Sequence, residues 1–430
     1  MRKSKRIFII CMIGAVFFLS GCSERKEKQV EITVMHGWGS TEMDHKEMQK
    51  IYSDFQNKYP DISLNLIAMP TGKEMVERAE DRILVGDLPD VIFCGDAGKE
   101  SLYQFMIENE LALDLMPYIK EDKELLHSIA PSSMEYWKTK DGKLYTVSDV
   151  LMLGGGYWYN EEIFREAGIT SIPETWEEFY SACQKIQTWS ETANKDVMPL
   201  GPTVEGYLYI TDQMLAKNRG RGSVAISQNK VPMSQSEICT VLEQQKELWH
   251  YTKPLSKEYS YRDETDLFND GKLAMYINGI WGAFMIDETL PASYALLPFG
   301  EGAEIACESA GLGYLLGNNR ELKNESNASI KFLKYMLSKE VQERILLKTG
   351  QMPANPQITI EQYSEKMPRF CQAATEVKQA DIKIQVPANL WNSAQMHIFE
   401  EYLPVFFQEE MSGEVFFQLL ERNGQNRLKK

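Results

Sequence analysis

Hydrophobic residues recur along the first hundred positions in two alternating spacings, one typical of strands and one of helices. The β-branched residues of 31–35 predict a strand. A helix is expected next, because apolar side chains recur at near-helical spacing at Met43, Met48, Ile51, Tyr52 and Phe55. Residues 62–69 and 89–93 predict further strands, with a helix over 73–84 between them. This βαβαβ order predicts an α/β fold with a parallel sheet.

The same alternation continues through the rest of the chain. An extended run ends at the glycine triplet 154–156, and Asn160 is placed to cap a helix over 161–167. Thr175 and Glu178 have the spacing of a capping box, which predicts another helix start. Two further strands and then two further helices are expected, at 272–277, 294–297, 330–337 and 338–347. The α/β order therefore persists throughout.

The amino terminus has the three parts of a signal peptide. Residues 1–6 carry four positive charges, residues 7–19 are apolar, and Leu-Ser-Gly precedes Cys22. The apolar run is shorter than the roughly 20 residues that span a bilayer, so we expect residues 1–21 to be removed. The site resembles the bacterial lipobox, which makes Cys22 the candidate lipidation site and residues 22–30 a lipidated tether. Ordinary secretory cleavage is the alternative.

Charge and length limit the partners and the architecture. The chain has a net charge of −16, and removal of residues 1–21 takes away four positive charges, which leaves about −20. A negative charge of that size repels phosphate, so nucleic acid is not an expected partner. A cationic ligand such as a polyamine would suit the charge and stays an open alternative. The mature length of roughly 400 residues exceeds what one hydrophobic core usually holds, so we expect two lobes.

The sequence contains no recognisable catalytic or metal-binding motif. The five histidines lack HExxH spacing, and neither a phosphate-binding loop nor a GxSxG turn occurs. We therefore expect no metal, no cofactor and no enzyme activity, although the 62 carboxylates leave a secreted carbohydrate hydrolase as an alternative. Irregular spacing favours small buried thiols but leaves one long-range disulfide open among Cys94, Cys183, Cys239, Cys307 and Cys371.

Several segments together resemble the extracellular solute-binding proteins of sugar ABC importers. Asp54–Ile62 resembles the family's F…KYP.I junction between a helix and a strand, and Gly86–Val91 resembles its G..PDV pattern. An ordered series at near-usual spacing is the strongest part, at Lys143–Tyr145, Trp158–Gly168 and Pro173–Phe179. Phe268–Met275 and Asn278–Trp281 resemble the later F..GKAAM…G.W signature. The resemblance covers nearly the whole mature chain.

The resemblance implies a two-lobed, periplasmic-binding-protein-like type II fold with a hinge and an interlobe cleft. The amino-terminal lobe would comprise residues 31–149 and 300–338, and the carboxy-terminal lobe residues 150–299 and 339–430. The chain would cross between the lobes at 148–153, 297–302 and 337–342. The glycine triplet would either ease the first crossing or admit close packing of backbones.

Four candidate ligand contacts follow from topology. Trp38 and Asp96 come directly after predicted parallel strands, whose carboxyl ends deliver side chains to a cleft. Glu42 could join them from the first turn of the next helix, where the helix dipole also explains a carboxylate. Tyr157 opens the second lobe beside the expected hinge. Sugars need carboxylates for their hydroxyls and flat aromatic rings for their C–H faces, which these residues provide.

Four more candidates rest on the resemblance. Trp281 matches a ligand-stacking tryptophan of the family, and Glu205 with Tyr207 resembles a Glu-Pro-Tyr contact segment in which glycine replaces proline here. Trp391 precedes a late helix, where the family often places an aromatic residue. Core packing is the alternative role for each aromatic residue, and an exposed turn is the alternative for Glu205.

The resemblance also implies the function. We expect a monomer, lipid-anchored at the extracellular face of the cell membrane, that binds a sugar or oligosaccharide between its lobes. It would deliver this ligand to the transmembrane subunits of an ABC importer, without chemistry of its own. A protein of the same fold that reports the ligand to a sensor is a further alternative.

Overall fold

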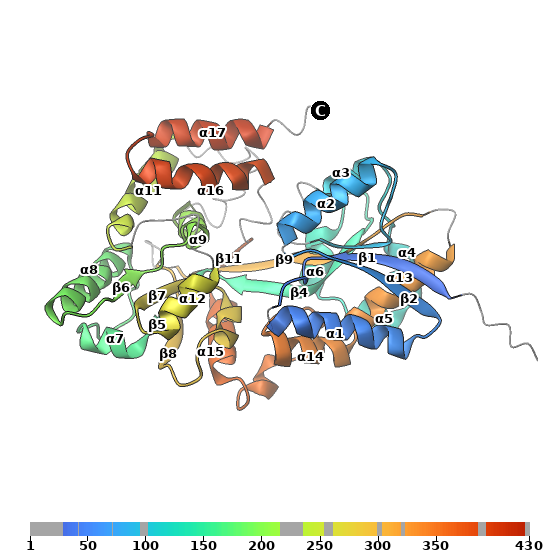
Figure 1. The fold of residues 1–430 in the computed structure, drawn as a ribbon, viewed down its shortest axis with the longest axis horizontal. Coiled ribbons are helices and arrows are strands. Elements are labelled where there is room, and N and C mark those ends of the chain that lie inside the picture. Colours follow the sequence, from blue (N-terminus) through green and yellow to red (C-terminus); the bar gives the residue numbers. More distant parts are fainter. Residues whose placement is uncertain are drawn as a thin grey trace, which may run out of the picture.

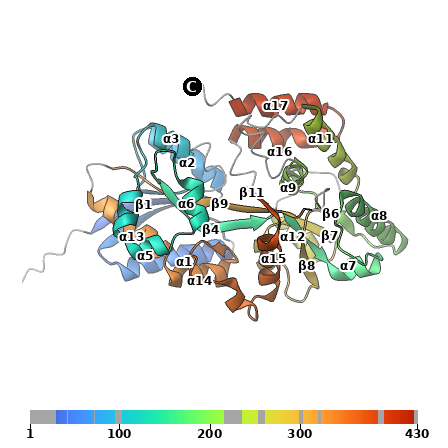
Figure 2. The same ribbon diagram turned by 180° about the vertical axis from the view of Figure 1, so that it is seen from behind.

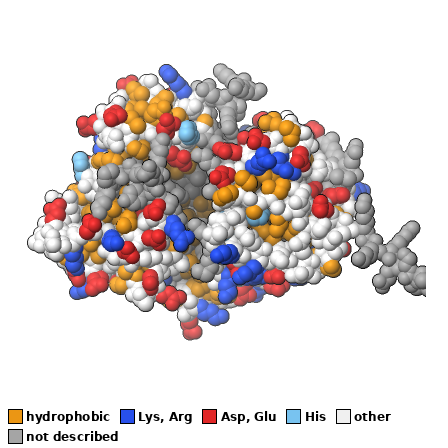
Figure 3. All heavy atoms as spheres, viewed as in Figure 1, with side chains coloured by type: hydrophobic (Ala, Val, Ile, Leu, Met, Phe, Trp, Pro, Cys, Tyr) orange, Lys and Arg blue, Asp and Glu red, His pale blue; other side chains and the backbone are white. Residues whose placement is uncertain are grey.

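A computed structural model shows two α/β lobes side by side, each built on its own β-sheet (Figure 1). The surface is hollowed between them (Figure 3). The structure describes residues 29–41, 43–70, 72–94, 102–215, 235–252, 261–298, 303–319, 323–385 and 393–425. No helix within these ranges is long and apolar enough to cross a membrane.

The sheet of the first lobe has seven strands in the order β10-β4-β9-β3-β1-β2, with β11 off this path, paired with the end of β9 that lies in the second lobe. The strands are β1 (Val30–His36), β2 (Ile62–Ala68), β3 (Val91–Cys94), β4 (Thr146–Gly154), β9 (Ile305–Leu316), β10 (Met352–Pro353) and β11 (Ile382–Ile384). β1 is parallel to both β2 and β3, which confirms the predicted βαβαβ start. β9 is antiparallel to β3 and β4, so the complete sheet is mixed.

Helices cover this sheet and bury their apolar stripes against it. They are α1 (Met43–Lys58), α2 (Gly72–Leu84), α3 (Leu102–Glu108), α4 (Met116–Glu121), α5 (Lys123–His127), α6 (Pro131–Trp137), α13 (Lys323–Met336) and α14 (Lys339–Thr349). In α1 the predicted stripe points into the core, where Met48, Ile51 and Phe55 are buried. The helical periodicity read from the sequence therefore identified the inner face of α1.

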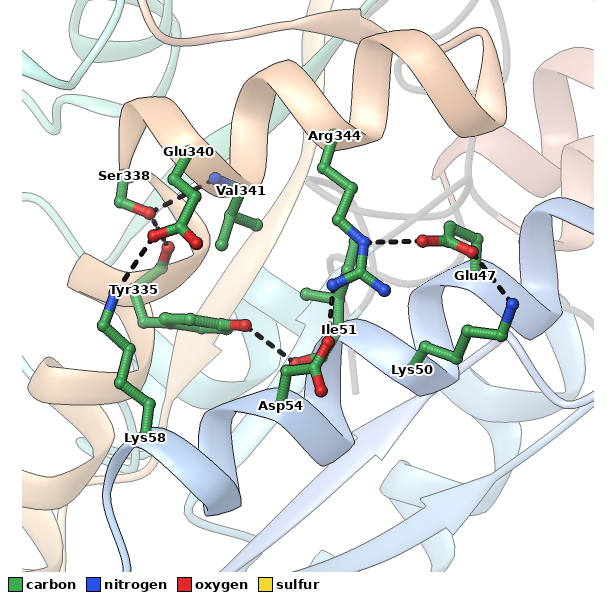
Figure 4. Close-up of polar contacts among 10 residues, drawn as sticks. All are labelled: Glu47, Lys50, Ile51, Asp54, Lys58, Tyr335, Ser338, Glu340, Val341 and Arg344. Carbon is green, nitrogen blue, oxygen red and sulfur yellow. Dashed lines mark hydrogen bonds and ion pairs between the residues drawn. The ribbon is translucent and has the colours of Figure 1, made fainter.

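Ion pairs hold α14 against α1 (Figure 4). The Arg344 guanidinium lies 2.5 Å from a Glu47 carboxylate oxygen and 2.6 Å from one of Asp54. Lys58 at the end of α1 reaches Glu340, at 3.2 Å. Because α14 packs on the first lobe, we propose a third crossing later than the expected 337–342, after the short strand β10.

The second lobe is built on a four-stranded sheet with the order β6-β7-β5-β8. Its strands are β5 (Gly156–Asn160), β6 (Met198–Leu200), β7 (Leu273–Asn278) and β8 (Ala292–Leu296). The surrounding helices are α7 (Glu161–Glu166), α8 (Trp176–Thr192), α9 (Val204–Leu215), α11 (Gln235–Trp249), α12 (Tyr261–Asn269), η2 (Ile280–Phe284), η3 (Ile360–Tyr363), α15 (Pro368–Gln379), α16 (Ser393–Phe407) and α17 (Gly413–Gln425). The last two lie side by side at one end of the lobe in both views (Figures 1 and 2).

Strands β4 and β9 connect the lobes as an antiparallel pair. At one end of β9, Ile305 and Cys307 belong to the second lobe's core, and at the other Leu315 belongs to the first lobe's core. The pairing is irregular between Ser148 and Met152 on β4, where the register shifts twice. Each strand is therefore part of both lobes.

The glycine triplet between β4 and β5 is closely packed. Gly155 has φ +88°, and a Cβ atom there would lie 2.7 Å from the backbone nitrogen of Cys307. A Cβ atom on Gly156 would lie 2.2 Å from the carbonyl oxygen of Ala295. Close packing of backbones, one of the two expected roles, explains why these positions have no side chain.

The helix ends follow the predicted capping residues. The Asn160 side chain accepts hydrogen bonds from the first turn of α7, and Thr175 with Glu178 forms the predicted capping box of α8. Gly350 ends α14 in the left-handed region at φ +71°. Local sequence signals thus fix these boundaries.

Candidate functional site

Half of the predicted contact residues can be placed with their side chains. Glu42, Asp96 and Trp391 lie outside the described residues, and only the backbone of Glu205 is described, in the first turn of α9. The described side chains are those of Trp38, Tyr157, Tyr207 and Trp281.

Trp281 lies in η2, beside the end of β4, one of the two strands that connect the lobes. Its indole ring covers Gly279, where a Cβ atom would approach the ring to 2.1 Å. The ring edge is also near Gly154 at the end of β4, where a Cβ atom would lie 4.0 Å from it. The side chain is half-buried. Two positions without side chains therefore make room for an aromatic ring at the lobe junction.

A buried polar network fixes the backbone that carries Trp281. The Asn278 amide donates to the Tyr276 hydroxyl at 2.5 Å, while its oxygen accepts from the Gly279 backbone N–H at 2.8 Å. The Trp158 indole N–H donates to the Gly279 carbonyl oxygen at 3.0 Å. Asn278 was not among the predicted site residues, although it lies within the motif that contains Trp281. Its role is to hold the loop in one conformation.

Trp38 occupies the corresponding position in the first lobe, directly after β1. Its ring lies 5.3 Å from that of Phe93 and 5.1 Å from that of His45. The Trp38 backbone N–H donates to Nδ1 of His36 at 3.1 Å. Burial, with His45 nearby, lowers the pKa of His36 to about 4, so at neutral pH the ring is uncharged and can accept this bond. Trp38 is half-buried, at the carboxyl edge where parallel strands were expected to present it.

Tyr157 and Tyr207 lie in the core of the second lobe instead of at its surface. Both are fully buried. Tyr157, on the inner strand β5, packs edge-on against Phe179 of α8, with ring centroids 5.3 Å apart. Tyr207, on the inner face of α9, packs against Phe407 of α16 at 5.0 Å. Their rings have no free face in this arrangement, so we propose a ligand site without them.

Two buried acids were not anticipated. Asp149 lies at the irregularity in β4, fully buried, and burial raises its pKa to about 7. It is close to Tyr314, whose hydroxyl is 2.8 Å from that of Tyr52. In the second lobe, buried Glu264 accepts a hydrogen bond from Thr203 at 2.9 Å. The sequence carried no local signal for either, because their burial depends on distant segments.

The described residues show no cluster of side chains that could hold a metal ion. Cys183, Cys239, Cys307 and Cys371 are free thiols. Burial raises the pKa of the Cys183 and Cys307 thiols well above the usual value, which makes them unreactive core residues. The side chain of Cys94 is not among those that the structure describes.

Residues 50–369 match the family described as bacterial extracellular solute-binding protein. The chain is 26% identical over 308 residues to the multiple sugar-binding protein of Streptococcus mutans, a match that covers 68% of each chain. It is 22% identical over 346 residues to a putative ABC transporter periplasmic-binding protein of Escherichia coli, which covers 78% of this chain and 75% of the relative.

The fold is shared with solved structures. A solute-binding protein of Streptococcus pneumoniae, solved in complex with the blood group A-trisaccharide, superposes with a TM-score of 0.75 at 23% identity. The match covers 91% of this chain and 98% of that chain. This likeness confirms the predicted periplasmic-binding-protein fold, here with two mixed sheets. The matched family consists of binding proteins and not of enzymes, and the chain belongs to it: it is a bacterial extracellular solute-binding protein.

Proposed function

We propose that the protein is the substrate-binding lipoprotein of an ABC importer, and that it binds a sugar or oligosaccharide between its lobes. The observation that carries the sugar assignment is the setting of Trp281, a half-buried indole held rigidly at the lobe junction. A flat aromatic ring can pack on the C–H face of a sugar. One relative named for sugar binding, and one similar structure solved with a trisaccharide, support the same ligand class.

In this proposal each lobe contributes one tryptophan to the ligand site. Trp38 follows β1 in the first lobe, and Trp281 follows β7 in the second. A ligand that contacts both lobes binds the closed form more tightly than the open form, and this difference in affinity is what drives closure. The closed form would then be the one that the importer subunits recognise. The name of the Escherichia coli relative supports the transport role.

The membrane anchor is a separate part of the proposal. Cys22 would carry the lipid, and residues 22–30 would join it to the first strand of the first lobe. This arrangement would place the protein on the extracellular face of the cell membrane. Globomycin, which blocks removal of lipoprotein signal peptides, should cause a larger precursor to accumulate. A Cys22→Ser variant should lose its lipid and leave the membrane fraction, and retention of that variant would contradict the assignment.

A thermal-shift screen of the purified mature protein tests the ligand class. The panel would contain mono-, di- and oligosaccharides, with polyamines and amino acids for comparison. A ligand at 100 times its dissociation constant adds about 2.7 kcal/mol to the free energy of unfolding, which raises the melting temperature measurably. Saturable stabilisation by one set of saccharides, without their turnover, is the expected result. Stabilisation by polyamines or amino acids alone would overturn the sugar assignment and leave the binding role intact.

A further inference from the structure

One glutamine of α9 contacts two of the chain segments that lead from the second lobe towards the first. Gln213 is fully buried. Its amide nitrogen lies 3.3 Å from the carbonyl oxygen of Gly155 and 3.3 Å from that of Ile305. Gly155 is the link between β4 and β5, and Ile305 is the first residue of β9. A single side chain therefore bridges two of the crossings.

The space around this bridge is filled. A Cβ atom on Gly155 would lie 2.5 Å from the Gln213 amide nitrogen, and Gly155 itself adopts φ +88°. The Gly155 carbonyl oxygen also accepts from the Leu297 backbone N–H at 3.0 Å, directly after β8. The crossing segments are thus fastened to α9 and to the second sheet at the same point.

A contribution to folding stability does not by itself explain why a glutamine occupies position 213. Its side-chain oxygen accepts no hydrogen bond from the described residues, although it is buried. An acceptor left in this state opposes folding, and an apolar side chain of similar length would avoid that cost. The contribution of Gln213 therefore lies in what its nitrogen holds together.

The first lobe has its own fixed point on the same strands. The Trp137 indole N–H donates to the Ala310 carbonyl oxygen on β9 at 2.7 Å, and to the Ser148 hydroxyl on β4 at 3.1 Å. Between the two fixed points, the pairing of β4 with β9 shifts register at Ser148–Val150 and Val150–Met152. Irregular pairing of this kind bends and twists a strand pair locally.

We propose that Gln213 is a positioning residue that fixes both crossing segments to the second lobe, so that the lobes bend within β4 and β9 between Ser148 and Gly154. This inference rests on the proposed closure of the lobes around a ligand. It moves the pivot away from the glycine triplet, which then rotates with the second lobe. The ring of Trp281 lies near Gly154, where the bending segment ends. Trp281 therefore keeps its position relative to the pivot when the lobes move.

Gln213→Met tests the inference, with Gln245→Met as its matched control. Gln245, on α11, is also fully buried, and its amide nitrogen donates to the Thr211 hydroxyl at 2.7 Å. Thr211 lies on α9, the helix that carries Gln213, but this bond does not involve the crossings. Hydrogen exchange would be measured on the mature protein without ligand. In Gln213→Met we expect backbone amides within 152–156 and 305–308 to exchange about fivefold faster, because one local restraint is lost. In Gln245→Met these amides should exchange at the wild-type rate.

Two outcomes would overturn the proposal. One is wild-type exchange at the crossings in Gln213→Met, and the other is an equal acceleration in both variants, which would indicate general loosening. Gln213→Leu, which also lacks the amide, serves as a second variant if Gln213→Met does not fold. X-ray scattering should show a broader range of lobe separations in the Gln213 variants than in Gln245→Met. Because no ligand is present, failure of the sugar assignment would leave these results interpretable.

Discussion

The position of Trp281 depends on neighbours that have no side chain. Gly279 and Gly154 leave the space that the indole ring fills, and the Trp158 indole N–H fixes the backbone at Gly279. A ring held in this way loses little freedom when a ligand packs on it, so more of the contact energy appears as affinity.

Trp281→Ala should therefore weaken saccharide binding by about tenfold or more, which corresponds to roughly 1.4 kcal/mol. Trp189→Ala is the matched control, because Trp189 is also half-buried but lies on α8, within the second lobe. Titration calorimetry with a saccharide identified in the thermal-shift screen would measure both. Equal affinities for the two folded variants would remove Trp281 from the site.

Asp149 should make stability depend on pH. Burial raises its pKa from the ordinary 3.8 to about 7, so the folded protein retains a proton that the unfolded chain releases. Stability should fall as pH rises from about 4 to about 7 and stay level above that, with a total change of up to about 4 kcal/mol. Asp149→Asn removes this contribution.

Urea unfolding at pH 5 and pH 8 would measure the effect. The gain in stability of Asp149→Asn over the wild type should be larger at pH 8 than at pH 5. Asp81→Asn, at an exposed position on α2, should behave like the wild type at both pH values. A constant difference between Asp149→Asn and the wild type across this range would show that Asp149 does not titrate there.

The half-buried tryptophans could be predicted from the sequence, but the buried polar residues could not. Trp38 follows a strand that local pattern predicts, and Trp281 lies within a recognisable motif. Asp149 and Gln213 have no such signal, because segments distant in the sequence contact them, including Tyr314 for Asp149 and Ile305 for Gln213. The same limit explains Tyr157 and Tyr207, whose neighbours Phe179 and Phe407 could not be assigned to them beforehand.

At the scale of elements, local signals predicted most of the helices and strands that were named. Alternating spacing identified β1, α1, β2, α2 and β3, and capping residues identified the starts of α7 and α8. Local sequence signals could not predict to which lobe α14 belongs. Its attachment to α1 depends on side chains about 290 positions apart, such as Arg344 and Asp54.

Arg344→Met should lower the free energy of unfolding by about 1 kcal/mol, because it removes two charge-assisted contacts of a partly buried guanidinium. Lys143→Met, which breaks the exposed pair with Asp141, should change stability very little. Urea unfolding of both variants would show this difference, and a double-mutant cycle with Glu47→Gln would isolate the coupling across α1 and α14. A coupling of zero would mean that apolar packing alone attaches α14.

At the scale of the whole molecule, two lobes joined by a strand pair should move as two rigid bodies. A saturating saccharide should lower the radius of gyration measured by X-ray scattering, because closure brings the lobes together. The decrease should require ligand contacts with both lobes, so Trp281→Ala should shift it to higher ligand concentrations. A ligand that binds with no decrease would indicate that the lobes do not close on binding.

The shared strand β9 also has a consequence for the order in which the protein is made. β9 lies between β3 and β4 in the first sheet. More than two hundred residues must therefore be synthesised after β3 before β3 can pair with β9. Sheets with such distant partners form slowly. A nascent chain that cannot complete its first lobe early stays unfolded for longer, and an unfolded chain is the form that can be threaded through a secretion channel.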